Sequence, residues 1–324
     1  MSLKEIYQVL PPILREQIQS LPRTIQESLE EIRVRQSRPL EVITSEQNWF
    51  VNANCQLSAQ PQNPIIPTKE DCSQMVNLIS RHSLYALEEE LRMGFITVEG
   101  GHRIGIVGKV TIEGGKVKII RDLTGFNIRI AKQIKGVGEG LIPFIFTSAT
   151  IHNTLIVSPP QCGKTTLLRD LTRIASTGSD VHRAVKVGLV DERSEIAGSI
   201  HGVPQLDIGV RTDVLDACPK AEGMMMMIRS MSPEVLVFDE IGRVEDREAI
   251  QEAIFAGVKI FTTVHGQSIE EIQKRPLLAQ LLADKAFTRI IILNRGKGPG
   301  TIVAIYDESL RSIRLNGAVG MTLL

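Results

Sequence analysis

The spacing of hydrophobic and polar residues changes near residue 150 and divides the chain into two regions. Residues 1–133 begin with an amphipathic helical stretch that prolines interrupt, and continue with short segments in which apolar and polar residues alternate. Alternation is typical of half-buried strands, and the Gly-Gly pairs at 100–101 and 114–115 are typical of the turns between them. The pattern predicts an N-terminal α+β domain with an antiparallel meander. Its predicted strands cover 32–35, 40–43, 95–98, 102–107, 110–112, 117–120 and 127–131; a loop covers 52–67, and helices cover 68–79 and 85–91.

Beyond residue 150, apolar β-branched runs alternate with segments of helical spacing, which predicts an α/β domain. The glycines and the proline in 134–150 favour a hinge before it. The predicted domains are therefore 1–133, the hinge 134–150, and 151–324. The predicted strands of the last domain cover 154–157, 185–190, 235–238, 258–264, 287–293 and 301–306, and its helices begin at 164 and cover 220–231 and 247–256.

A strand, a short loop and a helix start meet in the stretch TLIVSPPQCGKTT, residues 154–166. This is the context of a P-loop, whose backbone N–H groups and helix N-terminus bind phosphate. Lys164 is expected to reach the β- and γ-phosphates and the Thr165 hydroxyl to bind Mg²⁺. A serine stands where the pattern G-x-x-x-x-G-K-[ST] has its first glycine. The alternative to a P-loop is therefore a Gly-Lys-Thr sequence that follows a strand by chance. The predicted phosphate-binding residues are Ser158, Pro159, Pro160, Gln161, Cys162, Gly163, Lys164, Thr165 and Thr166.

Further polar residues follow three other predicted strands of the same domain. Asp239 and Glu240 come directly after VLVF, which has the form of a Walker B: Asp239 is expected to hold Mg²⁺ through water, and Glu240 to orient or deprotonate the attacking water. The alternative is a charged pair that caps a strand. His265 ends another strand, where it could sense the γ-phosphate or be structural. Since ligands bind at the carboxyl ends of such strands, these residues predict one nucleotide site.

An acidic loop, VDERSEIAG, follows the strand at 185–190. Asp191 is predicted as a metal ligand, and Glu192 and Glu195 as catalytic carboxylates; a solvated loop is the alternative. Phosphoryl transfer also needs a cation on the transferring group, often an arginine of a neighbouring subunit. The candidate arginines are Arg193, Arg211, Arg229 and Arg243.

Composition limits the classes of function. The chain has 324 residues, with 37 Lys and Arg against 37 Asp and Glu, so no strong binding to nucleic acid is expected. The four cysteines are scattered and form neither a disulfide framework nor a zinc motif. No apolar run approaches the ~18 residues of a membrane span. The N-terminus lacks a signal-peptide core, so a cytoplasmic protein is expected, docked on a membrane only through partners.

The segments SPPQCGKTTLLRD, VDERSEIAG, RTDVLDACPKAEGMMMMIRSMSPEVLVFDEIGRVED and TTVHG resemble the stage III sporulation protein AA family. EIRVRQSRPLEV and GFITVEGGHRIGIVGKV in the N-terminal region resemble it too. That family is similar to the RecA-like ATPases of type II and type IV secretion systems. The resemblance matches Gly163, Lys164 and Thr165 to the Walker A, Asp191, Glu192 and Glu195 to the acidic "Asp box", Glu240 to the Walker B, and Thr263 and His265 to the "His box". Four positions depart from the secretion ATPases. Ser158 replaces glycine, Arg193 replaces the usual proline, and Asp239 stands where glycine is frequent. Arg229, before Pro233, lies one residue out of register with the arginine finger of those ATPases.

The resemblance implies an ATPase, with ATP and Mg²⁺ as cofactors, that forms a homo-oligomeric ring of six subunits. It implies a motor in the mother cell during endospore formation, beneath membrane-anchored sporulation channel proteins of the same operon. Two alternatives stay open. One is a P-loop protein that handles single-stranded nucleic acid, and the other is a nucleotide-dependent scaffold with slow turnover.

Overall fold

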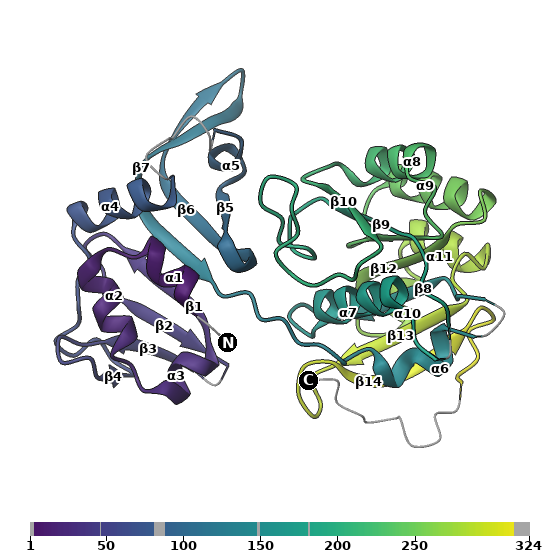
Figure 1. The fold of residues 1–324 in the computed structure, drawn as a ribbon, viewed down its shortest axis with the longest axis horizontal. Helices are drawn as coiled ribbons and strands as arrows, with labels where there is room; N and C mark the ends of the chain where they lie inside the picture. Colours follow the sequence, from purple (N-terminus) through teal and green to yellow (C-terminus); the bar gives the residue numbers. More distant parts are fainter. Residues whose placement is uncertain (1–2, 46, 81–87, 148–149, 181, 314–324) are drawn as a thin grey trace. The chain divides into compact units, whose positions relative to one another are not determined.

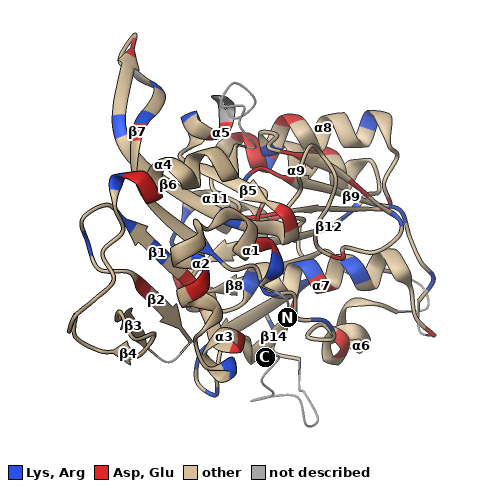
Figure 2. Ribbon diagram, turned by 60° about the vertical axis from the view of Figure 1, so that its left-hand side comes forward, with Lys and Arg blue, Asp and Glu red and all other residues tan. Residues whose placement is uncertain are grey.

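The computed structural model describes residues 3–45, 47–80, 88–147, 150–180 and 182–313, and the chain forms two compact units, 1–132 and 133–324 (Figure 1). The predicted fold class, an α+β region with an antiparallel meander followed by a RecA-like α/β region, is confirmed. Basic and acidic positions are mixed along the helices and loops of each unit instead of gathering on one element (Figure 2). Among the described residues, no helix is long and apolar enough to cross a membrane.

The first unit is built on a seven-stranded sheet of order β4-β3-β2-β1-β7-β6-β5, in which every neighbouring pair is antiparallel. The strands are β1 Leu29–Arg35, β2 Glu41–Thr44, β3 Asn48–Val51, β4 Leu57–Ser58, β5 Phe95–Val98, β6 His102–Glu113 and β7 Lys116–Arg129. The helices are α1 Lys4–Val9, α2 Pro12–Gln19, α3 Arg23–Ser28, α4 Lys69–Ile79 and α5 Glu88–Met93, with a 3₁₀ turn η2 at Glu99–Gly101.

One face of this sheet carries the core of the unit. Alternate residues of β1 and β6, such as Ile32 and Ile104, are fully buried against apolar side chains of α1, α2 and α4, such as Ile6 and Met75. Prolines set the breaks between the first helices, as predicted. The strands predicted at 117–120 and 127–131 are parts of β7, because the bulge opposite Gly108 bends the ladder without ending it. Strands β3 and β4 were not predicted, and residues 85–87 of the helix expected at 85–91 lie outside the described residues.

The second unit holds a seven-stranded sheet of order β10-β9-β11-β12-β8-β13-β14, parallel except for the antiparallel β14 at one edge. Its strands are β8 Thr154–Ser158, β9 Val187–Asp191, β10 Thr212–Asp216, β11 Val235–Phe238, β12 Lys259–His265, β13 Arg289–Asn294 and β14 Thr301–Asp307. Its helices are α6 Ile142–Ile145, α7 Lys164–Thr177, α8 Lys220–Ser230, α9 Val244–Phe255, α10 Ile269–Ile272 and α11 Pro276–Ala283, with a 3₁₀ turn η3 at Glu139–Leu141.

Helices cover both faces of this sheet, so its strands are apolar on both sides. Leu167 and Leu171 of α7 pack on one face, while helices α8, α9 and α11 pack on the other. Only Met224 and Met227 of the four consecutive methionines are buried, and Met226 is 47% exposed, so α8 buries one side and not its whole circumference. In the stretch expected as a hinge, 134–150, the turn η3 and helix α6 pack into the core of the second unit.

Strand order is the feature of this fold that positions the site. Strand β12 lies between β8, which leads into the P-loop, and β11, which leads into Asp239 and Glu240. The carboxyl end of β12, with His265, therefore lies between the two motifs. The sequence carries no signal for this order, because β12 follows β11 in the chain and pairs with β8 across more than a hundred residues.

Candidate active site

The P-loop runs from the end of β8 to the start of α7. Ser158, fully buried, donates from Oγ to the carbonyl oxygen of Pro159 (2.8 Å). Gln161 and Gly163 have φ angles of +57° and +84°, and Gly163 is the N-cap of α7. Positive φ angles in such a loop turn successive N–H groups toward one side, where they join the N-terminus of a 14-residue helix. The local geometry is that of an anion-binding loop.

Lys164 places a buried ammonium beside this loop. The residue is 8% exposed, and its Nζ donates to Nδ1 of His265 at 2.9 Å. Burial lowers the pKa of Lys164, and the negative charges of Asp239, Glu240 and Glu195 oppose that effect. Yet within the described residues no carboxylate oxygen lies within 4.0 Å of this ammonium. A buried cation without an ion-pair partner, next to converging N–H groups, fits a bound phosphate.

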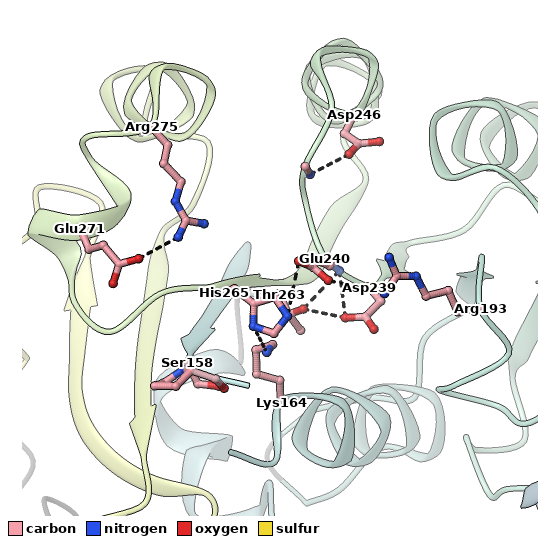
Figure 3. Close-up of polar contacts among 12 residues, drawn as sticks. Ser158, Lys164, Arg193, Asp239, Glu240, Asp246, Thr263, His265, Glu271 and Arg275 are labelled. Atoms are coloured by element: carbon pink, nitrogen blue, oxygen red, sulfur yellow. Dashed lines mark hydrogen bonds and ion pairs between the residues drawn. The ribbon is translucent and has the colours of Figure 1, made fainter. Parts of the chain in front are cut away.

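His265 connects the lysine to the acidic pair after β11 (Figure 3). Its Nε2 lies 3.5 Å from Oε1 of Glu240. Thr263, on the same strand, donates from Oγ1 to Oδ1 of Asp239 (2.6 Å) and accepts from the backbone N–H of Glu240 (3.2 Å). The neighbouring strand therefore sets the direction of both carboxylates. Lys164, His265 and Glu240 form one continuous polar row.

Asp191 has a different role from the one predicted. It is 1% exposed, and its carboxylate accepts backbone N–H bonds from Glu195, Ile196 and Ala197 at 2.9, 3.0 and 2.8 Å. Burial raises the pKa of Asp191 to about 6, which these hydrogen bonds oppose. Because both oxygens are occupied by the backbone, the predicted role of metal ligand does not fit this geometry. Asp191 instead holds the acidic loop in shape.

A buried arginine of α7 fastens the same loop to the P-loop helix. Arg169 is 7% exposed and donates to the carbonyl oxygens of Ile196 (2.5 Å) and Glu195 (2.8 Å). Burial lowers its pKa, and the charge of Asp191 opposes this. Sequence analysis missed Arg169, because helical spacing alone does not show that a charged residue between leucines is buried.

The two glutamates of the acidic loop lie in different surroundings. Glu192 pairs with Lys220 (2.9 Å) and lies 3.9 Å from Arg243. Glu195 lies near enough to Lys164 for its charge to raise the pKa of that lysine. Arg193, which is exposed, extends an Nη1 to 4.0 Å from Oε2 of Glu240. Of the predicted catalytic residues, the structure thus brings Lys164, His265 and Glu240 together, while Glu195 acts on Lys164 through its charge. Glu192 is directed toward other cations.

The donors near the P-loop suit a magnesium ion that arrives with phosphate. Among the residues that the structure describes, no group of three or more His, Cys, Asp or Glu side chains could hold a metal by itself. Mg²⁺ commonly takes one or two protein oxygens and completes its shell with water and phosphate oxygens. Thr165 lies in the first turn of α7, and Thr263 holds the carboxylate of Asp239, so both residues fit that arrangement.

The second unit has a RecA-like fold, and the solved structures that resemble the chain include secretion and pilus-motor ATPases. The ATPase DotB of Yersinia pseudotuberculosis superposes with a TM-score of 0.57 at 13% identity, over 92% of this chain and 80% of DotB. The pilus retraction motor PilT, solved with bound ADP, superposes with a TM-score of 0.52 at 16% identity, over 83% of this chain and 76% of PilT. At such identities the likeness concerns the fold.

The family follows from the sequence. Residues 2–314 match the family described as sporulation stage III, protein AA, and the chain belongs to that family. It is 48% identical over 306 residues to stage III sporulation protein AA of Bacillus subtilis strain 168, which covers 94% of this chain and 95% of that protein. The resemblance stated from the sequence motifs is therefore confirmed.

Proposed function

We propose that this chain hydrolyses ATP in the presence of Mg²⁺. The observation that carries the proposal is the polar row from the buried Lys164 ammonium through His265 to Glu240, at the carboxyl ends of adjacent strands. Residues 158–166 would hold the phosphates, with Lys164 as the cation that compensates their charge. Bound Mg²⁺ would neutralise charge on the phosphates, with Thr165 and Asp239 as the residues to hold it.

Glu240 would orient the attacking water. Its carboxylate is partly buried, and Thr263 and Asp239 hold its backbone N–H. His265 lies between Glu240 and Lys164, so it can hold the direction of the carboxylate relative to the phosphate-binding lysine. A carboxylate in this position can accept a proton from water as the nucleophile forms.

The larger assembly is also a proposal. Family membership and the likeness to secretion and pilus-motor ATPases support a homo-oligomeric ring of six subunits. The ring would act in the cytoplasm of the mother cell, on membrane-anchored sporulation channel proteins of the same operon, and would use ATP to assemble or drive that channel. Sedimentation of the purified protein with and without nucleotide tests the ring, and a strictly monomeric protein with full activity would contradict it.

The chemistry is tested by comparing Glu240→Gln with the wild type in a steady-state phosphate-release assay with Mg²⁺. We expect Glu240→Gln to lower kcat by about 100-fold or more, since general-base contributions are of that order. ADP affinity should stay within about threefold, because the phosphate-binding loop is unchanged. Glu252→Gln, on the exposed side of α9, is the matched control and should behave as wild type. Wild-type protein that binds ATP without turnover, also after addition of its membrane partner, would instead support a scaffold.

A further inference from the structure

The loop between β13 and β14, residues 295–300, contacts the P-loop although it belongs to none of the nucleotide-binding motifs. Arg295 donates from Nε and Nη2 to the carbonyl oxygen of Gln161 (3.1 and 2.7 Å), and its Nη2 also lies 3.4 Å from Oε1 of that residue. The backbone N–H of Gly300 donates to the carbonyl oxygen of Cys162 (3.0 Å). Two consecutive carbonyls of the P-loop are therefore held by one distant loop.

These two carbonyls determine where the adjacent N–H groups point. In a planar trans peptide the C=O of one residue and the N–H of the next point in opposite directions. Holding the carbonyls of Gln161 and Cys162 from the β13–β14 side therefore turns the N–H groups of Cys162 and Gly163 to the opposite side. An anion-binding loop requires its N–H groups to converge on the ligand and its carbonyls to face away.

The P-loop needs such support because of its own residues. Gln161 adopts a φ of +57°, an uncommon backbone conformation for a residue other than glycine. Such a conformation persists where surrounding contacts stabilise it. The charged guanidinium forms stronger hydrogen bonds than a neutral donor would, which suits it to hold this carbonyl.

The 295–300 loop is held by hydrogen bonds of its own. Gly298 and Gly300 have φ angles of +122° and +79°, which a side chain would strain. The Thr301 hydroxyl donates to the carbonyl of Gly298 (2.7 Å), and Asn294 accepts the N–H of Gly296 (2.9 Å). These local bonds fix Arg295 and Gly300 at the end of the β13–β14 hairpin, so that they can act as a rigid support.

We propose that Arg295 is a positioning residue that, together with Gly300, holds the P-loop in its phosphate-binding conformation. The inference rests on the proposed function in so far as the phosphate belongs to a nucleotide. Arg295 acts through the backbone of Gln161 and not on the reacting atoms. Its loss should therefore weaken phosphate binding more than it slows the chemical step.

The first test measures ADP binding by calorimetry and ATP turnover for Arg295→Ala in the full-length protein with Mg²⁺. We expect the Kd for ADP and the KM for ATP to rise about tenfold, with kcat changed less than threefold. Arg295→Lys, which keeps one cationic donor, should restore part of the affinity. Arg183→Ala, which removes an exposed arginine paired with Glu234 near the amino ends of the strands, is the control and should bind ADP as wild type does. An ADP affinity of Arg295→Ala within twofold of wild type would overturn the proposal, as would a lowered kcat with unchanged KM.

The second test needs no nucleotide. Cys162 is 2% exposed in the P-loop, so loss of the Arg295 hydrogen bonds should expose its thiol. We expect N-ethylmaleimide to modify Cys162 at least tenfold faster in Arg295→Ala than in wild type, as read by peptide mass. Cys72, 1% exposed in the first unit, is an internal control whose rate should not change. Equal rates of Cys162 modification in the two proteins would overturn the positioning role of Arg295, even if the wild type hydrolyses ATP. Faster modification of Cys162 in Arg295→Ala, combined with a wild type that shows no ATP turnover, would support the positioning role of Arg295 and count against the proposed hydrolysis.

Discussion

Replacing Lys164 with methionine should leave the ligand-free protein as stable as wild type, or more stable, while it abolishes most nucleotide affinity. Lys164 is 8% exposed, and burial lowers its pKa. A lysine whose pKa is lower in the folded state than in the unfolded chain costs folding free energy at pH 7, where both states hold it charged. Met keeps the unbranched apolar stem and removes the charge.

The size of the effect follows from two opposed contributions. Losing the hydrogen bond to His265 costs about 0.5–1.5 kcal/mol. Removing the charge relieves the cost of keeping it desolvated, which opposes that loss. We therefore expect a free energy of unfolding close to that of wild type, within about 1 kcal/mol. A buried aliphatic side chain truncated to alanine would instead cost about 2–5 kcal/mol.

Nucleotide binding should change in the opposite direction. Losing a charge-assisted contact to phosphate costs about 2–4 kcal/mol, which weakens the Kd for ADP by about 30- to 1,000-fold. Urea unfolding gives the stability and calorimetry gives the Kd, each measured on Lys164→Met and wild type at pH 7. A loss of stability greater than about 1 kcal/mol would refute the assignment of Lys164 as a destabilising buried cation. An unchanged ADP affinity would refute its role in phosphate binding.

Two further changes test the support of the site. Thr263→Val conserves the side-chain shape but removes the hydroxyl that lies between Asp239 and the N–H of Glu240. We expect a free energy of unfolding in urea about 1–2 kcal/mol lower, and a larger fall in kcat than in ADP affinity. Unchanged kcat and stability would contradict this. Since the pKa of Asp191 is raised from 3.8 to about 6, the folded state binds this proton more tightly, and its contribution to stability should fall as pH rises from about 4 to 6. Asp191→Asn should remove this pH dependence, a slope of up to about 1.4 kcal/mol per pH unit, from the free energy of unfolding measured in urea between pH 4.5 and 7. Parallel plots of unfolding free energy against pH for the two proteins would contradict this.

Local features of the first unit could be read from the sequence because neighbouring residues determine them. The helix predicted at 68–79 is α4, and it begins at a complete capping box in which Thr68 Oγ1 accepts from Asp71 N at 3.1 Å. Alternation predicted most strands, because a period of two follows from the pleat itself. The two-residue β4 was missed, since so short a strand exists only through its pairing with β3.

The candidate site likewise combines features that the sequence predicts with features that only the tertiary structure shows. Sequence by itself predicted a phosphate loop at residues 158–166 and a Walker B pair after β11, since each is a short motif with a required local context. The sequence also predicted that His265 ends a strand, but it did not show which strands lie beside that strand. Only the tertiary structure decided that β12 pairs with β8, which puts the His265 ring 2.9 Å from an ammonium 101 residues earlier in the chain.

Tertiary structure also decided which charged side chains hold the backbone of the site. Asp191 looked like a metal ligand because a carboxylate after a strand is compatible with that role, yet its oxygens accept three N–H groups of its own loop. The sequence suggested no role for Arg169 or Arg295, and their roles were found only through contacts with residues 27 and 134 positions away. The physical reason is that residue type specifies charge and hydrogen-bonding capacity, whereas long-range packing specifies the partner.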